Sequence, residues 1–489
     1  MASMKLSDVA RICSGRMVGN DVAIESVRID SRALAAGALF VAIRGDRFDG
    51  HDFLEQAAAA GAAAAVVSEQ AFAAGCARSV SGLPLAIVGD TRVALGALGN
   101  ARRQRLRGPV LGITASNGKT TIKEMSAAIL RAEAALHGTT PLAVAADPAA
   151  FEAAAAASVL ATPGNLNNEI GVPLTLLQIN SGHRYAVIEM GMNHKGEISR
   201  LTRIAEPDVA LIGNAGVAHI ENLGSREAIA AAKGEIFEGI RQGGTAVINA
   251  DDRFAGFWRD LAGAHRIVDF GIEHAAAVSA RWRLDYIGTD IRLRTPLGEA
   301  QVRLQVPGLH NVRNALAATA GTIACGAGLD AVLGGLSTFQ PVAGRLRLLQ
   351  GRSGSVLIDD TYNANPDSAL AAIEVLAERD GARVLVLGDM GELGETSGQM
   401  HAEVGAAARH FGLDLLLTLG TESARATEAF GDPARHFTEV AALVEALAGL
   451  LGPKVTVLVK GSRMMHMEQV IAPLRDPAAL DRDAAGGAH

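Results

Sequence analysis

GITASNGKTTIKEM, residues 112–125, is the stretch from which the organisation of the chain can be worked out. It follows the apolar residues 109–111, which are typical of a short buried strand, and it leads into residues 123–130, which have the pattern of a helix. A strand, a glycine-bearing turn, Lys-Thr and a helix form the layout of a phosphate-binding loop. Backbone N–H groups at such a helix start can bind a polyphosphate; Lys119 would add positive charge and Thr120 would offer a hydroxyl to Mg²⁺.

The spacing within this stretch departs from the strict G-x-x-x-x-G-K-[ST] pattern. The outer glycine, Gly112, lies six residues before Gly118, and Ile113 stands at the position where the strict pattern has glycine. The alternative interpretation is an ordinary strand-to-helix turn that happens to contain Gly-Lys-Thr.

Length, charge and cysteine content limit the class of protein. A chain of 489 residues predicts about three domains. The net charge of −7 argues against a general nucleic-acid or anionic-membrane surface. The three cysteines are far apart, which suits a reducing cytosol. No secretory signal or run of about 18 apolar residues is evident, so we expect a cytoplasmic protein without membrane insertion, and a monomer.

Strands and helices alternate along the chain, which predicts an α/β fold in three domains. The N-terminal domain and the C-terminal domain are predicted as α/β units on either side of a central domain with a parallel sheet of the phosphate-loop type. The predicted spans are 1–87 for the N-terminal domain, 88–335 for the central domain, 336–475 for a Rossmann-like C-terminal domain and 476–489 for a tail. An alanine-rich segment, 131–161, is predicted as a surface insertion with a helix over 149–160; a low-complexity linker is the alternative.

Polar residues gather at predicted strand ends of the central domain. Glu189 ends the strand 185–189, at the edge where ligands of parallel sheets bind, so its carboxylate could hold Mg²⁺ beside Thr120. Helix capping is the alternative for this glutamate. His219 and Lys233 also occur in this domain, and a lone histidine or helical lysine is ordinarily structural or solvated. Further polar candidates are Asn165, Asn167 and Asn168 ahead of a helix, and Asn249 at a strand end.

A second polar region lies in the N-terminal domain, where residues 44–53 are dense in charge and glycine. One hypothesis is that this region binds an anionic ligand through Ser31, Arg32 and the loop residues 47–51. The alternative is a solvated connection.

Taken in order, the motifs resemble the Mur ligases of peptidoglycan synthesis. The resemblance covers about residues 5–475 and includes the six-residue spacing of the two glycines. It rests on GITASNGKTT, GNLNNEIGVPLTLL, EMGMNHKGEI, VAHIENLGSREAIAAAKGEIF, INADD, GLHNVRNALAA, DDTYNANPDS, LGDMGELG and VKGSRMMHMEQVI.

The resemblance implies an ATP-dependent ligase that activates a carboxylate as an acyl phosphate, which an amine then attacks. Within the family, the motifs are most similar to those of the member whose substrates are UDP-N-acetylmuramoyl-tripeptide and D-Ala-D-Ala; lysine and diaminopimelate both fit the third peptide residue. The C-terminal domain would bring the dipeptide to the acyl phosphate, and its closure would exclude water.

The resemblance also implies roles for individual residues. Two Mg²⁺ sites are expected, with Thr120 and Glu189 at the first and His219 at the second. Lys233 corresponds to a lysine that the family carbamylates with CO₂, and Lys119, Lys233 and His219 are the expected catalytic residues. Expected ATP-binding residues are Gly112, Ile113, Thr114, Ala115, Ser116, Asn117, Gly118, Lys119, Thr120, Thr121, Asn249, Asn311, Arg345 and Asp360. Expected substrate-binding residues are Ser31, Arg32, Arg47, Asp49 and His51 for the UDP end, and Asn165, Asn167 and Asn168 for the peptide end.

Position 115 departs from the family pattern, because Ala115 stands where the family has glycine. If this residue needed a positive φ, alanine would cost about 1 kcal/mol of strain, so we predict weakened ATP binding. Three alternatives follow: another Mur-type amino-acid ligase, a folylpolyglutamate synthase, or a nucleotide-binding module that lacks catalysis.

Overall fold

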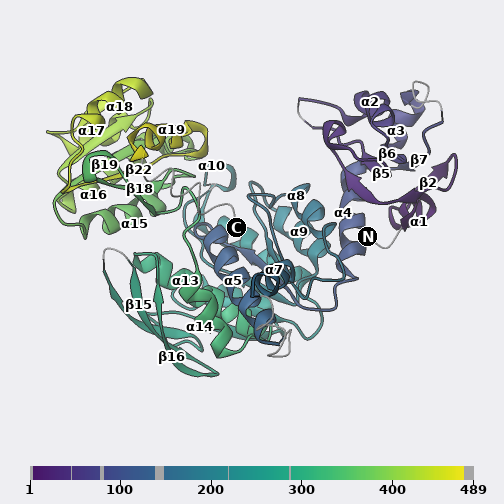
Figure 1. The fold of residues 1–489 in the computed structure, drawn as a ribbon, viewed down its shortest axis with the longest axis horizontal. Coiled ribbons are helices and arrows are strands. Elements are labelled where there is room, and N and C mark those ends of the chain that lie inside the picture. Colours follow the sequence, from purple (N-terminus) through teal and green to yellow (C-terminus); the bar gives the residue numbers. More distant parts are fainter. Residues whose placement is uncertain are drawn as a thin grey trace.

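The computed structural model describes residues 4–45, 47–76, 82–137, 148–218, 220–285 and 288–477. Three α/β units follow one another along the chain, and the central unit lies between the other two (Figure 1). The predicted three-part α/β fold is therefore confirmed.

The N-terminal unit contains a five-stranded sheet in the order β2-β7-β6-β5-β4, in which only β2 is antiparallel to its neighbour. Its strands are β4 (Ser26–Arg28), β5 (Ala38–Val41), β6 (Ala64–Ser68), β7 (Leu85–Val88) and β2 (Arg16–Val18). The helices are α1 (Leu6–Ile12), α2 (Leu54–Ala59) and α3 (Glu69–Ala73), and β1 (Met4–Lys5) pairs with β3 (Ala23–Ile24). Helix α4 (Thr91–Arg103) then connects this unit to the central one.

The central unit is built on a six-stranded parallel sheet in the order β13-β12-β11-β8-β10-β9. Its strands are β8 (Val110–Thr114), β9 (Val159–Ala161), β10 (Tyr185–Glu189), β11 (Val209–Ile212), β12 (Thr245–Asn249) and β13 (Arg266–Phe270). The helices are α5 (Lys119–His137), α7 (Pro148–Ala157), α8 (Gly171–Leu176), α9 (Glu197–Ala205), α10 (Ile220–Leu223), α11 (Arg226–Gly234), α12 (Ala255–Ala262), α13 (Leu309–Ala324) and α14 (Leu329–Thr338). Strand β8 lies between β10 and β11, so the ends of these three strands meet at the turn before α5.

Both faces of the sheet are buried at its inner strands β8, β10, β11 and β12, which explains why these strands are nearly continuous apolar runs. Leu111 and Ile113 of β8 pack into one core with α5, α13 and α14, while Val110 packs into a second core with α8, α9 and α12 on the other face. Alternate side chains of one strand therefore hold helices on opposite faces.

The alanine-rich segment 131–161 contains the end of one helix, a second helix and an edge strand. Helix α5 continues to His137, and residues 138–147 lie outside the described part of the chain. The predicted helix over 149–160 is wrong at its end, because α7 stops at Ala157 and β9 then joins the edge of the sheet. Val159 and Leu160 are buried there, so sheet pairing and core burial override the helical preference of the preceding alanines.

The C-terminal unit follows a three-stranded antiparallel sheet of β14 (Ser279–Leu284), β15 (Thr289–Thr295) and β16 (Gly298–Leu304). The predicted boundary at 335/336 falls inside α14, which packs on α5. The C-terminal sheet has the order β17-β18-β22-β19-β20-β21, with only β17 antiparallel. Its strands are β17 (Arg347–Gln350), β18 (Val356–Asp360), β19 (Ala382–Gly388), β20 (Leu415–Leu419), β21 (Arg435–Phe437) and β22 (Val455–Lys460), and its helices are α15 (Pro366–Ala377), α16 (Ser397–His410), α17 (Ala424–Phe430), α18 (Val440–Ala448) and α19 (Glu468–Ile471). Of the predicted tail, residues 478–489 lie outside the described residues.

No helix within the described ranges combines the length and the apolar character that a bilayer-spanning segment requires.

Candidate active site

A cavity of about 640 Å³ lies where the central and C-terminal units face each other. Its central-unit wall is formed by the turn before α5 and by polar residues at the ends of β10, β11 and β12. Its C-terminal wall includes Arg345, Asp360 and the start of α15. The cavity therefore lies beyond the carboxyl ends of parallel strands, where α/β folds bind ligands.

The turn before α5 is held in place by the end of β11. The backbone N–H groups of Ser116 and Asn117 donate to the carbonyl and the side-chain oxygen of Asn214, at 3.0 and 2.9 Å. Gly118 has a φ of +83°, and a Cβ atom at this position would overlap the side-chain oxygen of Asn314. Glycine is thus required at 118 for both its backbone conformation and its lack of a side chain.

Lys119 is the first residue of α5, and its ammonium lies over the preceding turn. Its Nζ donates to the carbonyl oxygens of Ala115, at 2.6 Å, and Ser116, at 3.3 Å. Burial lowers the pKa of Lys119; the Glu189 carboxylate opposes this shift, whereas the Arg345 guanidinium adds to it. A positive charge fixed over backbone carbonyls at a helix start is suited to an anionic phosphate.

Thr120 and Glu189 form the pair that was predicted to hold a metal. The Thr120 hydroxyl donates to Glu189 Oε2 at 3.0 Å, and Asn167 Nδ2 donates to Glu189 Oε1 at 2.8 Å. Arg345 Nη2 reaches across from the C-terminal unit and donates to the Thr120 hydroxyl at 3.0 Å. A hydroxyl and a buried carboxylate beside a phosphate-type loop are hard oxygen ligands, so the residues present fit Mg²⁺.

Lys233 lies on α11 and is almost fully buried. Burial lowers its pKa well below the ordinary value, the charge of Lys119 lowers it further, and Asp252 opposes the shift. None of the described residues accepts a hydrogen bond from its ammonium group. His219 lies outside the described residues, and within the described part no group of three or more His, Cys, Asp or Glu side chains could hold a metal.

The other predicted nucleotide-binding residues line the same cavity, although each also has a partner within the protein. Asn249 donates to the Gly213 carbonyl at 2.9 Å, and Asn311 donates to the Pro307 carbonyl at 2.8 Å. Asp360 accepts from Lys460 at 2.6 Å; burial raises the pKa of Asp360, and Lys460 opposes that shift. The arrangement brings together Ser116, Asn117, Gly118, Lys119, Thr120, Thr121, Asn249, Asn311, Arg345 and Asp360.

Four predicted nucleotide-binding residues do not line the cavity. Gly112, Ile113 and Thr114 belong to the buried strand β8, and the space beside Gly112 is filled by Met190 and Pro207. Ala115 does not have a positive φ, and its methyl group faces Gly213 rather than the cavity. The strain expected at Ala115 is therefore absent, because the left-handed residue of this turn is Gly118.

The predicted UDP-end residues lie in the N-terminal unit, and most are engaged internally. Ser31 donates to Gln56 at 2.9 Å, and Arg32 pairs with Asp30 on the surface. His51 Nε2 accepts from the Ser68 N–H at 3.0 Å, so its Nδ1 carries the proton that Asp49 accepts at 2.6 Å. Arg47 is exposed.

The charge of Asp49 is strongly stabilised in this loop. Burial raises its pKa, but hydrogen bonds from His51 and Arg44 outweigh burial and bring the pKa to about 2. Asp49 and His51 therefore hold the shape of the loop, a role that sequence reasoning missed because the Ser68 partner is distant in sequence.

The three candidate asparagines before α8 divide into two groups. Asn165 and Asn167 line the cavity. Asn168 accepts from the N–H groups of Ile170 and Gly171, at 3.2 and 2.8 Å, and so caps the start of α8. Asn168 is not among the residues that line the cavity, and its predicted role at the peptide end of the substrate stays a prediction.

Several cavity residues were missed by sequence reasoning. Asn314, His310, Tyr362 and Lys460 all line the cavity, and Arg345 stacks over the Tyr362 ring at 4.3 Å. Desolvation, with the charges of Lys460 and Arg313, lowers the pKa of His310 to about 4. The GLHNVRN and DDTYNANPDS motifs contain three of these residues and are the signals that could have identified them.

Profiles of known protein families match most of the chain. The Mur ligase family catalytic domain matches residues 23–101, the Mur ligase middle domain matches residues 113–322, and the Mur ligase glutamate ligase domain matches residues 344–463.

Individual proteins are similar over nearly the whole length. The chain is 40% identical over 480 residues to the UDP-N-acetylmuramoyl-tripeptide–D-alanyl-D-alanine ligase of Escherichia coli, covering 97% of this chain and 99% of that protein. The structure of MurF from Acinetobacter baumannii is similar with a TM-score of 0.85 and 34% identity, covering 97% and 99%. MurF ligase from Thermotoga maritima in complex with ADP gives a TM-score of 0.77 and 27% identity, covering 91% and 96%.

Proposed function

The chain belongs to the Mur ligase family, and from this premise we propose that it joins D-alanyl-D-alanine to UDP-N-acetylmuramoyl-tripeptide at the expense of ATP. The product would be the pentapeptide precursor of peptidoglycan. The observation that carries the proposal is the Thr120–Glu189 pair at a phosphate-type loop, in a chain with 40% identity to a ligase of that name over nearly its full length.

The chemistry has two steps. The terminal carboxylate of the tripeptide attacks the γ-phosphorus of ATP, the bond to the ADP oxygen breaks, and an acyl phosphate forms. The amine of D-alanyl-D-alanine then attacks the carbonyl carbon, phosphate leaves, and the nitrogen gives up a proton. Phosphoryl transfer depends mostly on positioning and charge neutralisation, and the cavity supports this with Lys119 and Arg345.

We assign the metal ligands to Thr120 and Glu189, with His219 at a second site. Mg²⁺, when bound, would neutralise charge on the phosphates. This assignment is supported by the distance of 3.0 Å between the Thr120 hydroxyl oxygen and Glu189 Oε2. Asn167 orients the carboxylate from the other side.

We further propose that Lys233 is carbamylated. The neutral amine of Lys233 would bond to the carbon of CO₂ and lose one proton, which leaves an anion at a position where a protonated lysine would be a cation. This requires a neutral amine, and the lowered pKa and burial of Lys233 favour one. An anion there would also neutralise the charge of the nearby Lys119.

The alternatives weigh less. A ligase that adds the third peptide residue, or a folylpolyglutamate synthase, would be expected to be about as similar to relatives with those names as this chain is to the Escherichia coli ligase, at 40% identity. A module without catalysis was suggested by Ala115, and that argument loses its basis because Ala115 is not left-handed. We also propose a cytoplasmic location, in line with three cysteines that form no disulfide.

The test is phosphate release from ATP with UDP-N-acetylmuramoyl-tripeptide, carrying either lysine or diaminopimelate, in the presence and absence of D-alanyl-D-alanine. We expect sustained release only when all three substrates are present, together with a pentapeptide product detected by mass spectrometry. Release that needs a different amine, or ATP binding without release in any combination, would refute the proposal.

A further inference from the structure

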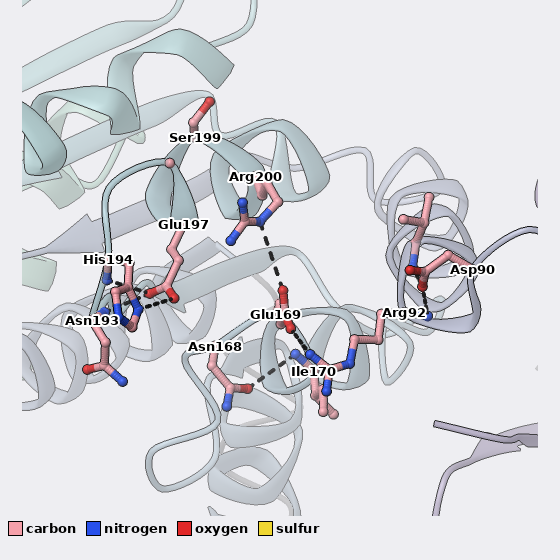
Figure 2. Close-up of polar contacts among 12 residues, drawn as sticks. Asp90, Arg92, Asn168, Glu169, Ile170, Asn193, His194, Glu197, Ser199 and Arg200 are labelled. Carbon is pink, nitrogen blue, oxygen red and sulfur yellow. Dashed lines mark hydrogen bonds and ion pairs between the residues drawn. The ribbon is translucent and has the colours of Figure 1, made fainter. Parts of the chain in front are cut away.

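Arg92 connects two segments that are far apart in sequence. It lies in the first turn of α4, whose start is capped by Asp90. Its Nη1 donates to Glu169 Oε1 at 2.6 Å, and its Nη2 donates to the Arg44 carbonyl oxygen at 2.6 Å. Figure 2 shows Arg92 reaching from α4 to Glu169, with Arg200 on the opposite side of that carboxylate.

Each of the two segments continues into a candidate substrate loop. Arg44 donates to Asp49 at 2.7 Å, so its carbonyl belongs to the loop that His51 and Asp49 shape. Glu169 follows directly after the asparagine loop 165–168, whose Asn167 contacts the Glu189 carboxylate. Arg92 thus forms a side-chain link between the loop proposed for the UDP end and the loop proposed for the peptide end.

This link contributes more to geometry than to stability. The Arg92 and Glu169 side chains are 39% and 38% exposed, and ion pairs in such positions contribute about 0–1 kcal/mol to folding. A forked guanidinium with two fixed partners nevertheless holds both in one relative position, which a flexible ammonium cannot do.

We propose that Arg92 and Glu169 are a positioning pair that sets the spacing between the UDP-end loop and the peptide-end loop for one extended substrate. This rests on the proposed function. A ligand that occupies two subsites gains affinity only when their separation matches its own length. Neither residue needs to touch the substrate for this role.

The experiment compares an intact substrate with a fragment. Calorimetric binding of UDP-N-acetylmuramoyl-tripeptide and of UDP-N-acetylmuramic acid, which lacks the peptide, is measured for the wild type, Arg92→Ala, Glu169→Ala and the double variant. We expect each variant to bind the intact substrate about tenfold more weakly and the fragment within about twofold of the wild type. The double variant should lose no more than either single variant, because the two residues act as one unit.

Two further variants show whether the loss of affinity comes from the forked geometry of Arg92, from its charge, or from the loss of an ion pair in general. Arg92→Lys keeps the charge without the fork, so it should behave like Arg92→Ala. Arg16→Ala removes an ion pair with Glu69 in the same unit that contacts neither loop, so it should behave like the wild type. KM for ATP should be unchanged in all of them.

The proposal is overturned if Arg92→Lys binds the intact substrate like the wild type, if the fragment loses as much affinity as the intact substrate, or if the two losses add. A wild type that does not convert the tripeptide with D-alanyl-D-alanine would instead refute the proposed function. The two failures are therefore distinguishable.

Discussion

Asp367, at the start of α15 in the C-terminal unit, accepts a hydrogen bond from the backbone N–H of Val217 in the central unit at 2.9 Å. The same carboxylate lies 3.5 Å from the Arg226 guanidinium. Gly216 leaves room for it, since a Cβ atom there would overlap Asp367 Oδ2. Beside it, Asn365 donates to the side-chain oxygen of Asn117 in the phosphate loop at 2.7 Å. The start of α15 thus holds the C-terminal unit against the loop that precedes His219.

We predict that Asp367→Ala lowers kcat by about tenfold, because a hydrogen bond to a charged group is lost where the two units close. Gly216→Ala should have the same effect by displacing the carboxylate. Asp367→Asn keeps an acceptor for the Val217 N–H and should retain most activity. Steady-state kinetics decide this, and equal kcat values for the wild type, Asp367→Ala and Gly216→Ala would contradict the role.

Lys119→Ala should abolish turnover. Its ammonium is placed over the phosphate loop by the Ala115 and Ser116 carbonyls, and alanine leaves that position without charge. Retention of more than a few per cent of the phosphate-release rate would remove this loop from the mechanism. Lys195→Ala, which also removes a lysine from the central unit but is not among the cavity-lining residues, is the matched control and should keep wild-type activity.

A buried strand was predictable where its own residues form an apolar run. The strand predicted over 185–189 is observed as β10 with the same bounds, because Ala186, Val187 and Ile188 are apolar and buried. Strand β9 has three residues and follows an alanine-rich helix, so its pairing with β10 decides its structure. Local pattern does not contain that information.

The residues of the candidate site were likewise predictable only where a local motif identified them. Lys119, Thr120 and Glu189 were identified by motif and strand end, and the structure brings them together. The sequence pattern could not show whether the Asn168 side chain faces the cavity or caps α8, because the local backbone conformation decides this. The neighbour of Ala115 in the fold is Gly213, which is distant in sequence, so local pattern could not identify this contact.

The contact between Ala115 and Gly213 leads to a third prediction. A methyl group at Gly213 would lie 2.9 Å from the Ala115 Cβ and 3.0 Å from Ile122 Cδ1, which is too close. Gly213→Ala should therefore destabilise the protein by about 1–3 kcal/mol through overpacking. Combining it with Ala115→Gly should recover part of the loss, as measured by urea unfolding.

Ala115→Gly alone should not tighten ATP binding, because Ala115 carries no left-handed strain. It should cost about 0.5–1 kcal/mol of stability, since glycine loses more conformational freedom on folding. Tighter ATP binding by this variant in calorimetry would show that the methyl group obstructs the nucleotide after all.

Replacing Lys233 by an apolar residue should abolish activity and raise stability. Its folded pKa is lowered from that of an unfolded lysine, so between the two values the unfolded chain binds more protons and stability rises with pH. Below the folded pKa, Lys233 is protonated in the folded protein, and the full free-energy cost of burying its charge lowers the stability. In CO₂-free buffer near neutral pH, Lys233→Met removes this burden at similar volume and should raise the unfolding midpoint, while abolishing turnover.

Lys233→Ala should be nearly inactive, and added short carboxylates should restore part of the rate, because they can supply the anion that the carbamate would provide. The wild type in ¹³CO₂-enriched buffer should show a carbamate carbon resonance by NMR that Lys233→Ala lacks. Lys454→Ala, which removes a lysine that does not line the cavity, is the control and should keep both the resonance and the rate. Full activity of Lys233→Ala without carboxylate would mean that the buried amine is only a packing element of α11.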